Sequence, residues 1–224
     1  MEVFSYVITA VAAYLLGSIP TGYLVARAKG IDIRSVGSGN IGATNVFRIL
    51  GKGAGIFVLL FDALKGFVAV VAVVNFYPEL HRAMPTIFGG ENFSKDRLRE
   101  NLGILAGVAA ILGHNYTCFL KFKGGKGIAT SAGVLIALVP GAFLIVLSIF
   151  ILVVALSRYI SLGSLVAALC LPIAVWLLHG SPTLIFVMVA LGALAIYKHK
   201  ANIKRLLNGT ENRFGSKKIV EAPK

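Results

Sequence analysis

Residues 128–156 read IATSAGVLIALVPGAFLIVLSIFILVVAL, an apolar run that is interrupted by Pro140-Gly141. A helix that crosses the hydrocarbon core of a bilayer needs about 20 mostly apolar residues. The run is longer than one such helix, and proline removes a backbone donor and breaks or kinks a helix. We therefore expect two short membrane helices that meet at a turn near Pro140. One long tilted helix is the alternative.

Apolar runs of similar character occupy most of the remaining chain. Only 14% of the residues are charged, whereas a soluble domain has about a quarter, and the mean hydropathy is +0.85. The run at 102–113 is short and extends back into the preceding polar segment. The composition predicts an all-α, polytopic membrane protein whose residues 1–224 form a single domain. The other runs are 3–26, 54–77, 102–113, 160–178 and 183–197.

The distribution of basic residues predicts the sidedness of these helices. The net charge is +13, but apart from Lys65 the Lys and Arg residues lie in short segments between the apolar runs and in the tail, which argues against nucleic-acid binding. Cytoplasmic loops of membrane proteins carry excess Lys and Arg, whereas the segment 75–101 is nearly neutral. Seven spans, some of them short, place the N-terminus outside and every basic stretch in the cytoplasm. The basic stretches are 27–52, 121–126, Arg158 and the tail from Lys198.

A first polar loop has the composition of an anion-binding site. Residues 36–45 read VGSGNIGATN, and Arg48 follows. Glycines let backbone amides approach a ligand closely, and a helix that begins after the loop directs its N–H groups toward an anion. A flexible turn between spans is the alternative. The candidate residues are Gly37, Ser38, Gly39, Asn40, Thr44, Asn45 and Arg48.

A second polar loop combines glycines with a lysine at the start of an apolar helix. Residues 121–127 read KFKGGKG, which resembles a phosphate loop in composition but lacks the G-x-x-x-x-G-K-[ST] order. We therefore infer an anion site without inferring a nucleotide; a basic flank of a span is the alternative. The candidates are Gly124, Gly125, Lys126, Gly127 and Thr130, with His114 and Asn115 as secondary ones.

Two further segments near the C-terminus carry candidate residues on helix faces. Ser161 and Ser164 are three positions apart and share a face, although a membrane serine is often satisfied by its own backbone. His199 and Asn202 have the same spacing at the end of the last span, and histidine titrates near neutral pH. Arg205 follows as a secondary candidate. A surface histidine in a basic anchor is the alternative.

Two charged residues lie inside an apolar run. Asp62 and Lys65 are three positions apart, and an unpaired charge in hydrocarbon is costly, so we expect a mutual pair that faces other helices. A structural and a functional pair remain equally open. The four histidines lack carboxylate partners at ligand spacing, and we expect no metal and no cofactor.

Several anion sites on one membrane face favour an enzyme that acts on a phosphorylated amphiphile. The residues alone leave acyl, phosphoryl and alcohol-phosphate transfer open. A carrier or channel would need a continuous polar stripe through the helices, and a structural membrane protein would tolerate substitution in the glycine loops.

Three sequence motifs resemble those of a known family and so narrow the choice of reaction. They are GSGNIGATN at 37–45, GHNYTCFLKFKGGKGIAT at 113–130 and HKANIKRLLNGTENRFG at 199–215. They closely resemble the bacterial acyl-phosphate:glycerol-3-phosphate acyltransferases, the PlsY family, in family order over residues 13–214. The segment 77–101 is longer than the family needs. The resemblance implies a seven-helix protein of the bacterial cytoplasmic (inner) membrane with its active site facing the cytoplasm.

The resemblance also implies the reaction and the residue roles. Acyl phosphate gives its acyl group to the 1-hydroxyl of sn-glycerol 3-phosphate, yielding lysophosphatidic acid and phosphate, as the first step of phospholipid synthesis. The partners are these two substrates and membrane lipid, with no obligate protein partner. Ser38 and Asn40 cradle the acyl phosphate, and Lys126, Arg48 and Ser164 bind phosphate. His199 and Asn202 orient the hydroxyl, whose proton goes either to His199 or to the leaving phosphate.

Overall fold

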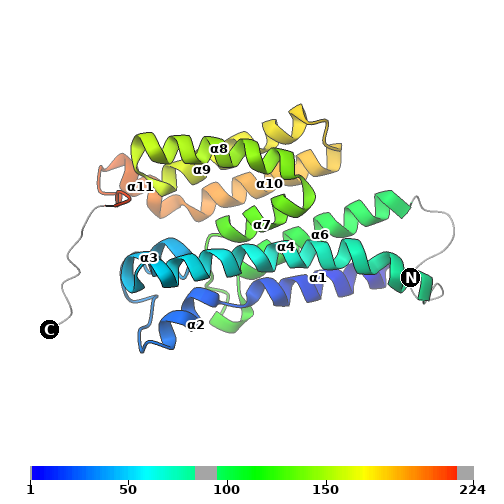
Figure 1. Cartoon of the computed structure of the whole chain (residues 1–224), viewed down its shortest axis with the longest axis horizontal. Helices are drawn as coiled ribbons and strands as arrows, with labels where there is room; N and C mark the ends of the chain where they lie inside the picture. Colours follow the sequence, from blue (N-terminus) through cyan, green and yellow to red (C-terminus); the bar gives the residue numbers. More distant parts are fainter. Residues whose placement is uncertain (1, 84–94, 216–224) are drawn as a thin grey trace. The chain divides into compact units, whose positions relative to one another are not determined.

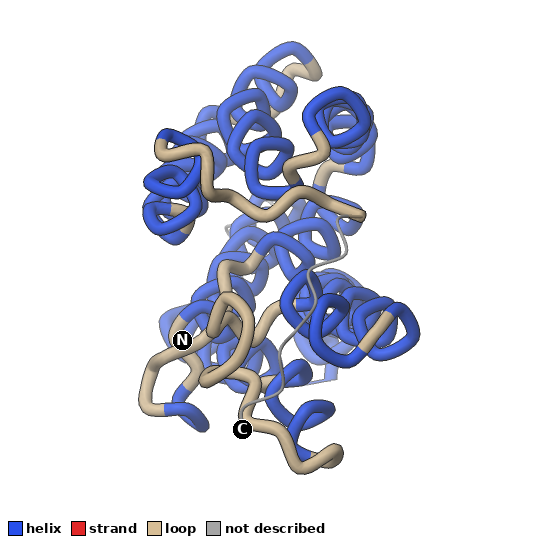
Figure 2. The backbone as a smooth tube through the Cα atoms, turned by 90° about the vertical axis from the view of Figure 1, so that its left-hand side faces the viewer, coloured by secondary structure: helices blue, strands red, loops and turns tan. Residues whose placement is uncertain are grey.

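The computed structural model describes residues 2–83 and 95–215, which form helices and connecting loops without a strand (Figures 1 and 2). The all-α fold is thus confirmed. The chain is organised as two compact units, Met1–Pro140 and Gly141–Lys224. The single domain expected for residues 1–224 stays a prediction. Of the long segment 77–101, residues 84–94 lie outside the described residues.

The first unit is built around three long helices that lie side by side, α1, α4 and α6 (Figure 1). Backbones approach closely where glycines face a neighbour: a Cβ on Gly17 would overlap the Ala110 carbonyl, and a Cβ on Gly133 would overlap the Ala63 carbonyl. Small residues at such helix interfaces are typical of membrane proteins. The elements are α1 (Glu2–Ser18), α2 (Thr21–Arg27), α3 (Ala43–Leu50), α4 (Lys52–Ala83), α6 (Lys95–Asn115), η1 (Cys118–Leu120) and α7 (Ile128–Leu138).

The first apolar run contains a break that its hydropathy does not indicate. α1 ends at Ser18 and α2 begins at Thr21, because Pro20 between them has no N–H to continue the helix. The carbonyls left at the break need donors in an apolar setting. Thr117 Oγ1 donates to the Ser18 carbonyl at 2.6 Å, and Lys65 Nζ donates to the Ile19 carbonyl at 2.9 Å. The carbonyls of Ser18 and Ile19 therefore both have hydrogen-bond donors, although the helix is broken between them and Thr21.

In the described part of the second unit, α8, α9 and α10 are of similar length, α9 and α10 pack against each other, and the shorter α11 follows α10. Ser181 caps α10, where its hydroxyl accepts a hydrogen bond of 3.2 Å from the Leu184 amide. α10 and α11 are bent by 58° relative to each other, and His199 lies at this bend. The helices are α8 (Pro140–Ser157), α9 (Ile160–Leu177), α10 (Pro182–Lys198) and α11 (Lys200–Leu207).

The apolar helices agree with the expected membrane protein. Within the described residues, five helices are long and apolar enough to span, a sixth span results if α10 and α11 are counted together, and α7 is a shorter apolar helix. The break near Pro140 is confirmed, as is the backward extension of the 102–113 run, since α6 starts at Lys95. The count of seven spans and their sidedness stay predictions.

Candidate functional site

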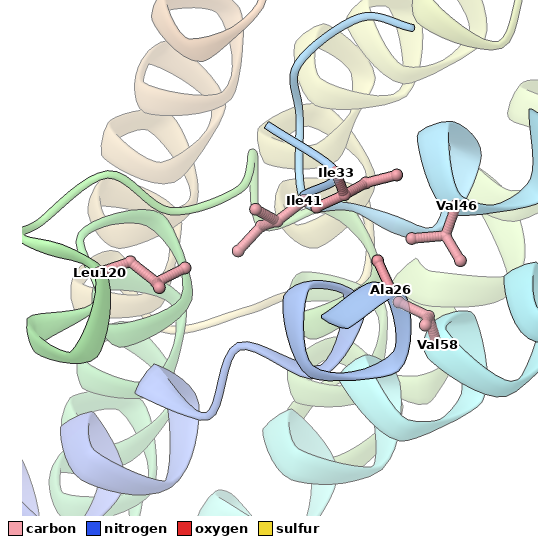
Figure 3. Close-up of a cluster of buried hydrophobic side chains, with 6 residues drawn as sticks. All are labelled: Ala26, Ile33, Ile41, Val46, Val58 and Leu120. Atoms are coloured by element: carbon pink, nitrogen blue, oxygen red, sulfur yellow. The ribbon is translucent and has the colours of Figure 1, made fainter. Parts of the chain in front are cut away.

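The loop between α2 and α3 is anchored by a hydrophobic cluster, so the structure does not favour the flexible-turn alternative. Ile33 and Ile41 lie at the two sides of the glycine segment, and both are buried (Figure 3). Leu120, from the turn that precedes the second polar loop, belongs to the same cluster. The two loops of the first unit therefore share one core. The cluster consists of Ala26, Ile33, Ile41, Val46, Val58 and Leu120.

Asn45, in the first turn of α3, holds the loop in its conformation. Its Oδ1 accepts a hydrogen bond of 2.9 Å from the Ser38 amide. Its Nδ2 donates to the carbonyls of Ile33 at 3.3 Å and Val36 at 3.1 Å. Gly37 has φ of +61°, and a Cβ there would overlap Asn45 Oδ1. Both amide protons of Asn45 are thus engaged within the loop.

The other predicted residues of this loop lie nearer to solvent. Ser38 and Thr44 are exposed, whereas Arg48 is half-buried and donates to Asn45 Oδ1 at 3.4 Å. Asn40 Oδ1 accepts from the Gly42 amide at 2.8 Å, just before α3 begins at Ala43. The start of a helix after the loop is confirmed. The exposed part of the loop presents Ser38 between Gly37 and Gly39.

The acidic residue of this loop is paired. Arg34 binds Asp32 in a salt bridge of 2.7 Å, and hydrogen bonds from the Arg34 side chain and amide lower the pKa of Asp32 to about 2. The Arg34 guanidinium also lies 4.8 Å from the centre of the Tyr23 ring. The negative charge of Asp32 is therefore compensated locally, which limits its repulsion of an anion at the loop.

The glycines of the second loop have a packing role. The amides of Gly124 and Gly125 donate to the carbonyls of Asn115 at 3.3 Å and His114 at 3.0 Å. A Cβ on Gly124 would overlap the His114 carbonyl, and one on Gly125 would overlap the His114 ring. Gly127 has φ of +82° and faces Asn115. Close packing on the end of α6 thus accounts for glycine at these positions, a reason that the spacing alone did not indicate.

Lys126 differs from the other lysines of this loop. It is half-buried, whereas Lys121 and Lys123 are exposed. It lies two residues before α7, which begins at Ile128, and Thr130 is buried in the first turn of that helix. The predicted lysine at the mouth of an apolar helix is confirmed, and its position next to the N-terminal N–H groups of α7 suits an anion.

In the second unit, three predicted residues converge on a carboxylate that the sequence did not single out. Glu211 Oε1 accepts from Ser161 Oγ at 2.9 Å and from Asn202 Nδ2 at 2.7 Å, and Oε2 accepts from Arg205 Nε at 2.7 Å. The available signal was that Glu211 is one of only two acidic residues, with Glu221, in an otherwise basic tail. Burial by itself raises the pKa of Glu211, but these hydrogen bonds outweigh it and hold the pKa below its ordinary value.

His199 is buried at the junction of α10 and α11. Its Nδ1 lies 2.8 Å from the Ala195 carbonyl. A carbonyl only accepts, so Nδ1 carries a proton, and in the neutral ring Nε2 has the lone pair. Ser164 is buried on α9, and its hydroxyl donates to the Ile160 carbonyl at 3.0 Å, as expected if a membrane serine is satisfied by its own backbone. Its oxygen lone pairs still accept hydrogen bonds.

The structure thus groups the predicted residues into sets. Asn45 and Arg48 in α3 are linked to Ser38 of the preceding loop through Asn45 Oδ1, and His114 and Asn115 support the segment 124–127. Ser161, Asn202 and Arg205 share Glu211. That Lys126 and His199 bind parts of one substrate complex stays a prediction.

Comparison with known proteins covers nearly the whole chain. The family model described as glycerol-3-phosphate acyltransferase matches residues 7–209. A glycerol-3-phosphate acyltransferase of Clostridioides difficile is 48% identical, covering 97% of this chain and 100% of the relative. One of Geobacter sulfurreducens is 47% identical, with 93% and 96% covered.

A solved structure shows the same fold. The crystal structure of PlsY, an integral membrane glycerol 3-phosphate acyltransferase, in its glycerol 3-phosphate form has a TM-score of 0.79 and 37% identity, covering 94% of this chain and 96% of that chain. Its lysophosphatidic acid form has a TM-score of 0.76 and 36% identity, with the same coverage. On the match of its sequence and its helical fold, this membrane protein belongs to the glycerol-3-phosphate acyltransferase family.

Proposed function

We propose that this enzyme transfers a fatty acyl group from an acyl phosphate to the 1-hydroxyl of sn-glycerol 3-phosphate, yielding lysophosphatidic acid and phosphate. The observation that carries the proposal is the likeness over 94% of the chain to a protein solved in glycerol 3-phosphate and lysophosphatidic acid forms. In the reaction the bond between the acyl carbon and the phosphate oxygen breaks. An ester bond to the hydroxyl oxygen forms, and the hydroxyl proton goes to the departing phosphate.

The residues of the chain support an acyl phosphate as the donor. The better-known acyltransferases that use a thioester cofactor carry a His-x4-Asp pair, and none of the four histidines here has aspartate five positions on, which fits a mechanism without a thioester. An acyl phosphate is already activated because phosphate is a good leaving group. Positioning and charge stabilisation are then the main tasks of the protein.

The polar loops carry the residues that we assign to positioning and to charge stabilisation. We assign the exposed Ser38 hydroxyl and the neighbouring Gly37 to the phosphate of the donor, in a loop whose Ser38 and Gly39 amides donate to Asn45 Oδ1 and to the Val36 carbonyl. We assign Lys126 at the start of α7, together with Arg48 and Ser164, to the second phosphate. Gly124, Gly125 and Gly127 support Lys126, and Asn40, Thr44 and Thr130 remain phosphate-binding candidates.

The acceptor hydroxyl is assigned to the C-terminal residues. With its proton on Nδ1, His199 offers Nε2 as the acceptor for the hydroxyl of glycerol 3-phosphate. Asn202 helps to orient this substrate, and its amide is fixed by Glu211. The departing phosphate gains negative charge as the bond to the acyl carbon breaks and is therefore basic enough to take the proton. His199 as the general base is the rival assignment.

We place the enzyme in the bacterial cytoplasmic membrane with its active site facing the cytoplasm. The support is the concentration of Lys and Arg in the loops that carry the candidate residues, since such loops remain on the cytoplasmic side. No obligate protein partner is required by this scheme.

Donor exchange tests the proposal. Purified protein in metal-free buffer should form lysophosphatidic acid from palmitoyl phosphate and glycerol 3-phosphate, and palmitoyl-CoA in place of palmitoyl phosphate should give no product. Product formation that depends on palmitoyl-CoA would overturn the assignment of the donor. A fluorescent tag on the C-terminus that proteases reach in right-side-out vesicles would overturn the assigned sidedness.

A further inference from the structure

A cluster of buried charged and polar side chains lies in the first unit. Through His114 it contacts the loop that carries Lys126. Asp62 and Lys65 on α4 form a salt bridge of 2.9 Å, and both are nearly inaccessible to solvent. Thr21 Oγ1 donates to Asp62 Oδ1 at 3.1 Å. On the other side of the cluster, Lys65 Nζ lies 3.0 Å from His114 Nδ1. The cluster therefore connects α2, α4 and the end of α6.

The contacts of Lys65 determine how His114 is oriented. Its ammonium group has three protons and three neighbours at hydrogen-bonding distance: the Ile19 carbonyl, Asp62 Oδ1 and His114 Nδ1. An imidazolium N–H at 3.0 Å from an ammonium would be repelled, so Nδ1 accepts from Lys65. The proton of a neutral His114 is then on Nε2, and the ring is fixed from one side.

The opposite side of the same ring supports the second loop. A Cβ built on Gly125 would overlap Nε2 and would lie 3.0 Å from Cδ2 and Cε1 of His114. The Gly125 amide also donates to the His114 carbonyl at 3.0 Å. Gly125 directly precedes Lys126. The position of the His114 ring therefore limits how closely the Gly125 backbone approaches α6, and in this way it determines the position of the Lys126 backbone.

We propose that His114 is a positioning residue for Lys126, held by Lys65 and Asp62 and acting through its contact with Gly125. The inference rests on the proposed function, in which Lys126 binds a substrate phosphate. A cluster that only completes the hydrogen bonds of the helix break at Ile19 would instead affect stability and leave the anion site intact.

The variant His114→Asn distinguishes a role in positioning Lys126 from a role in stability alone. Asparagine retains an oxygen at the position of Nδ1 that accepts from Lys65, but it lacks the ring atoms that contact Gly125. We expect the KM for glycerol 3-phosphate to rise about tenfold, with a smaller change in kcat and a Tm close to the wild type. Ile111→Val, a buried change one turn earlier on α6, is the control for general packing and should leave both KM values unchanged.

A double-mutant cycle tests the path through Lys126. If His114 acts through Lys126, then His114→Asn in a Lys126→Ala background should cause less than about a twofold further loss of kcat/KM, because coupled residues are not additive. Additive losses, or a lower Tm with an unchanged KM, would overturn the inference. The wild type would still form lysophosphatidic acid in that case, so the proposed function would stand.

The contact with Gly125 gives a second, independent test. Gly125→Ala should lower activity about tenfold because its Cβ overlaps the His114 ring, and His114→Asn should partly restore that activity in the double variant. A double variant that is no better than Gly125→Ala would contradict the contact as the cause. Absence of glycerol 3-phosphate acylation by the wild type would instead refute the proposed function.

Discussion

Asn202 Nδ2 donates a hydrogen bond of 2.7 Å to Glu211 Oε1. The same carboxylate accepts from Ser161 on α9 and Arg205 on α11. One acidic side chain in the C-terminal segment therefore fixes the orientation of a residue that we assign to the glycerol 3-phosphate site. The relationship makes Glu211 a residue whose loss should affect both stability and turnover.

Glu211→Gln should destabilise the protein by about 2 kcal/mol, because hydrogen bonds to a charged acceptor are among the stronger ones. The substitution leaves one accepting oxygen for three donors. Thermal unfolding in detergent checks this expectation, and Asp32→Asn is the control, since its exposed pair with Arg34 contributes little. Equal Tm values for the two variants would remove the role of Glu211.

The pH dependence of that difference follows from the sign of the pKa shift. The pKa of Glu211 is held below its ordinary value of 4.5. Its stabilising contribution is therefore fully present above pH 4.5 and is lost as the pH falls through the lower pKa of the folded state. The Tm difference between wild type and Glu211→Gln should stay constant from about pH 8 to 5 and shrink below about pH 4.5.

Gly37→Ala should disturb the first loop more than its backbone strain explains. Gly37 and Gly30 both have positive φ, of +61° and +73°, but only at Gly37 does a Cβ meet another group, Asn45 Oδ1. Each substitution costs about 1 kcal/mol in strain, and Gly37→Ala also displaces Asn45. We expect a loss of kcat/KM of at least about tenfold for Gly37→Ala. Similar activities of Gly37→Ala and Gly30→Ala would contradict the role of Asn45.

Lys126→Ala should be far more harmful than Lys123→Ala. Lys126 is half-buried beside the start of α7, whereas Lys123 is exposed. Loss of a charged contact to a substrate phosphate should reduce kcat/KM about a hundredfold, whereas Lys123→Ala should stay within about twofold. Steady-state kinetics with both substrates varied gives the comparison. A hundredfold loss for Lys123→Ala as well would mean that general positive charge is what matters.

His199→Ala distinguishes the two proton acceptors. If the leaving phosphate takes the proton, the variant should keep a measurable kcat with an unchanged pH profile, and its KM for glycerol 3-phosphate should rise. The physical reason is that His199 then only accepts a hydrogen bond through Nε2. Turnover that is abolished at every pH would instead identify His199 as the general base.

Much of the fold follows from the sequence because spans are set by long apolar runs. Pro140 correctly indicated the break between α7 and α8. The break at Pro20 was not predicted, since the run around it stays apolar and the donors that satisfy it, Lys65 and Thr117, are distant in sequence. Hydropathy indicates whether a segment lies in lipid or in water, but it carries no information about such long-range contacts.

Composition identifies the candidate residues, but it does not predict which groups they contact. Glu211 could not be paired with Ser161 because the two are 50 positions apart and belong to different elements. Composition predicts an anion site at Gly125, and the structure adds a packing reason for the glycine, which is the ring of His114. The expected pair of Asp62 and Lys65 is confirmed, and the contact of this pair with His114 depends on how α4 and α6 pack.

The most direct measurement is the stoichiometry of the reaction catalysed by the purified wild type. With palmitoyl phosphate and glycerol 3-phosphate in metal-free buffer, phosphate and lysophosphatidic acid should appear in equal amounts, and omission of glycerol 3-phosphate should stop phosphate release. Phosphate release at the same rate without glycerol 3-phosphate would contradict acyl transfer as the activity of this protein.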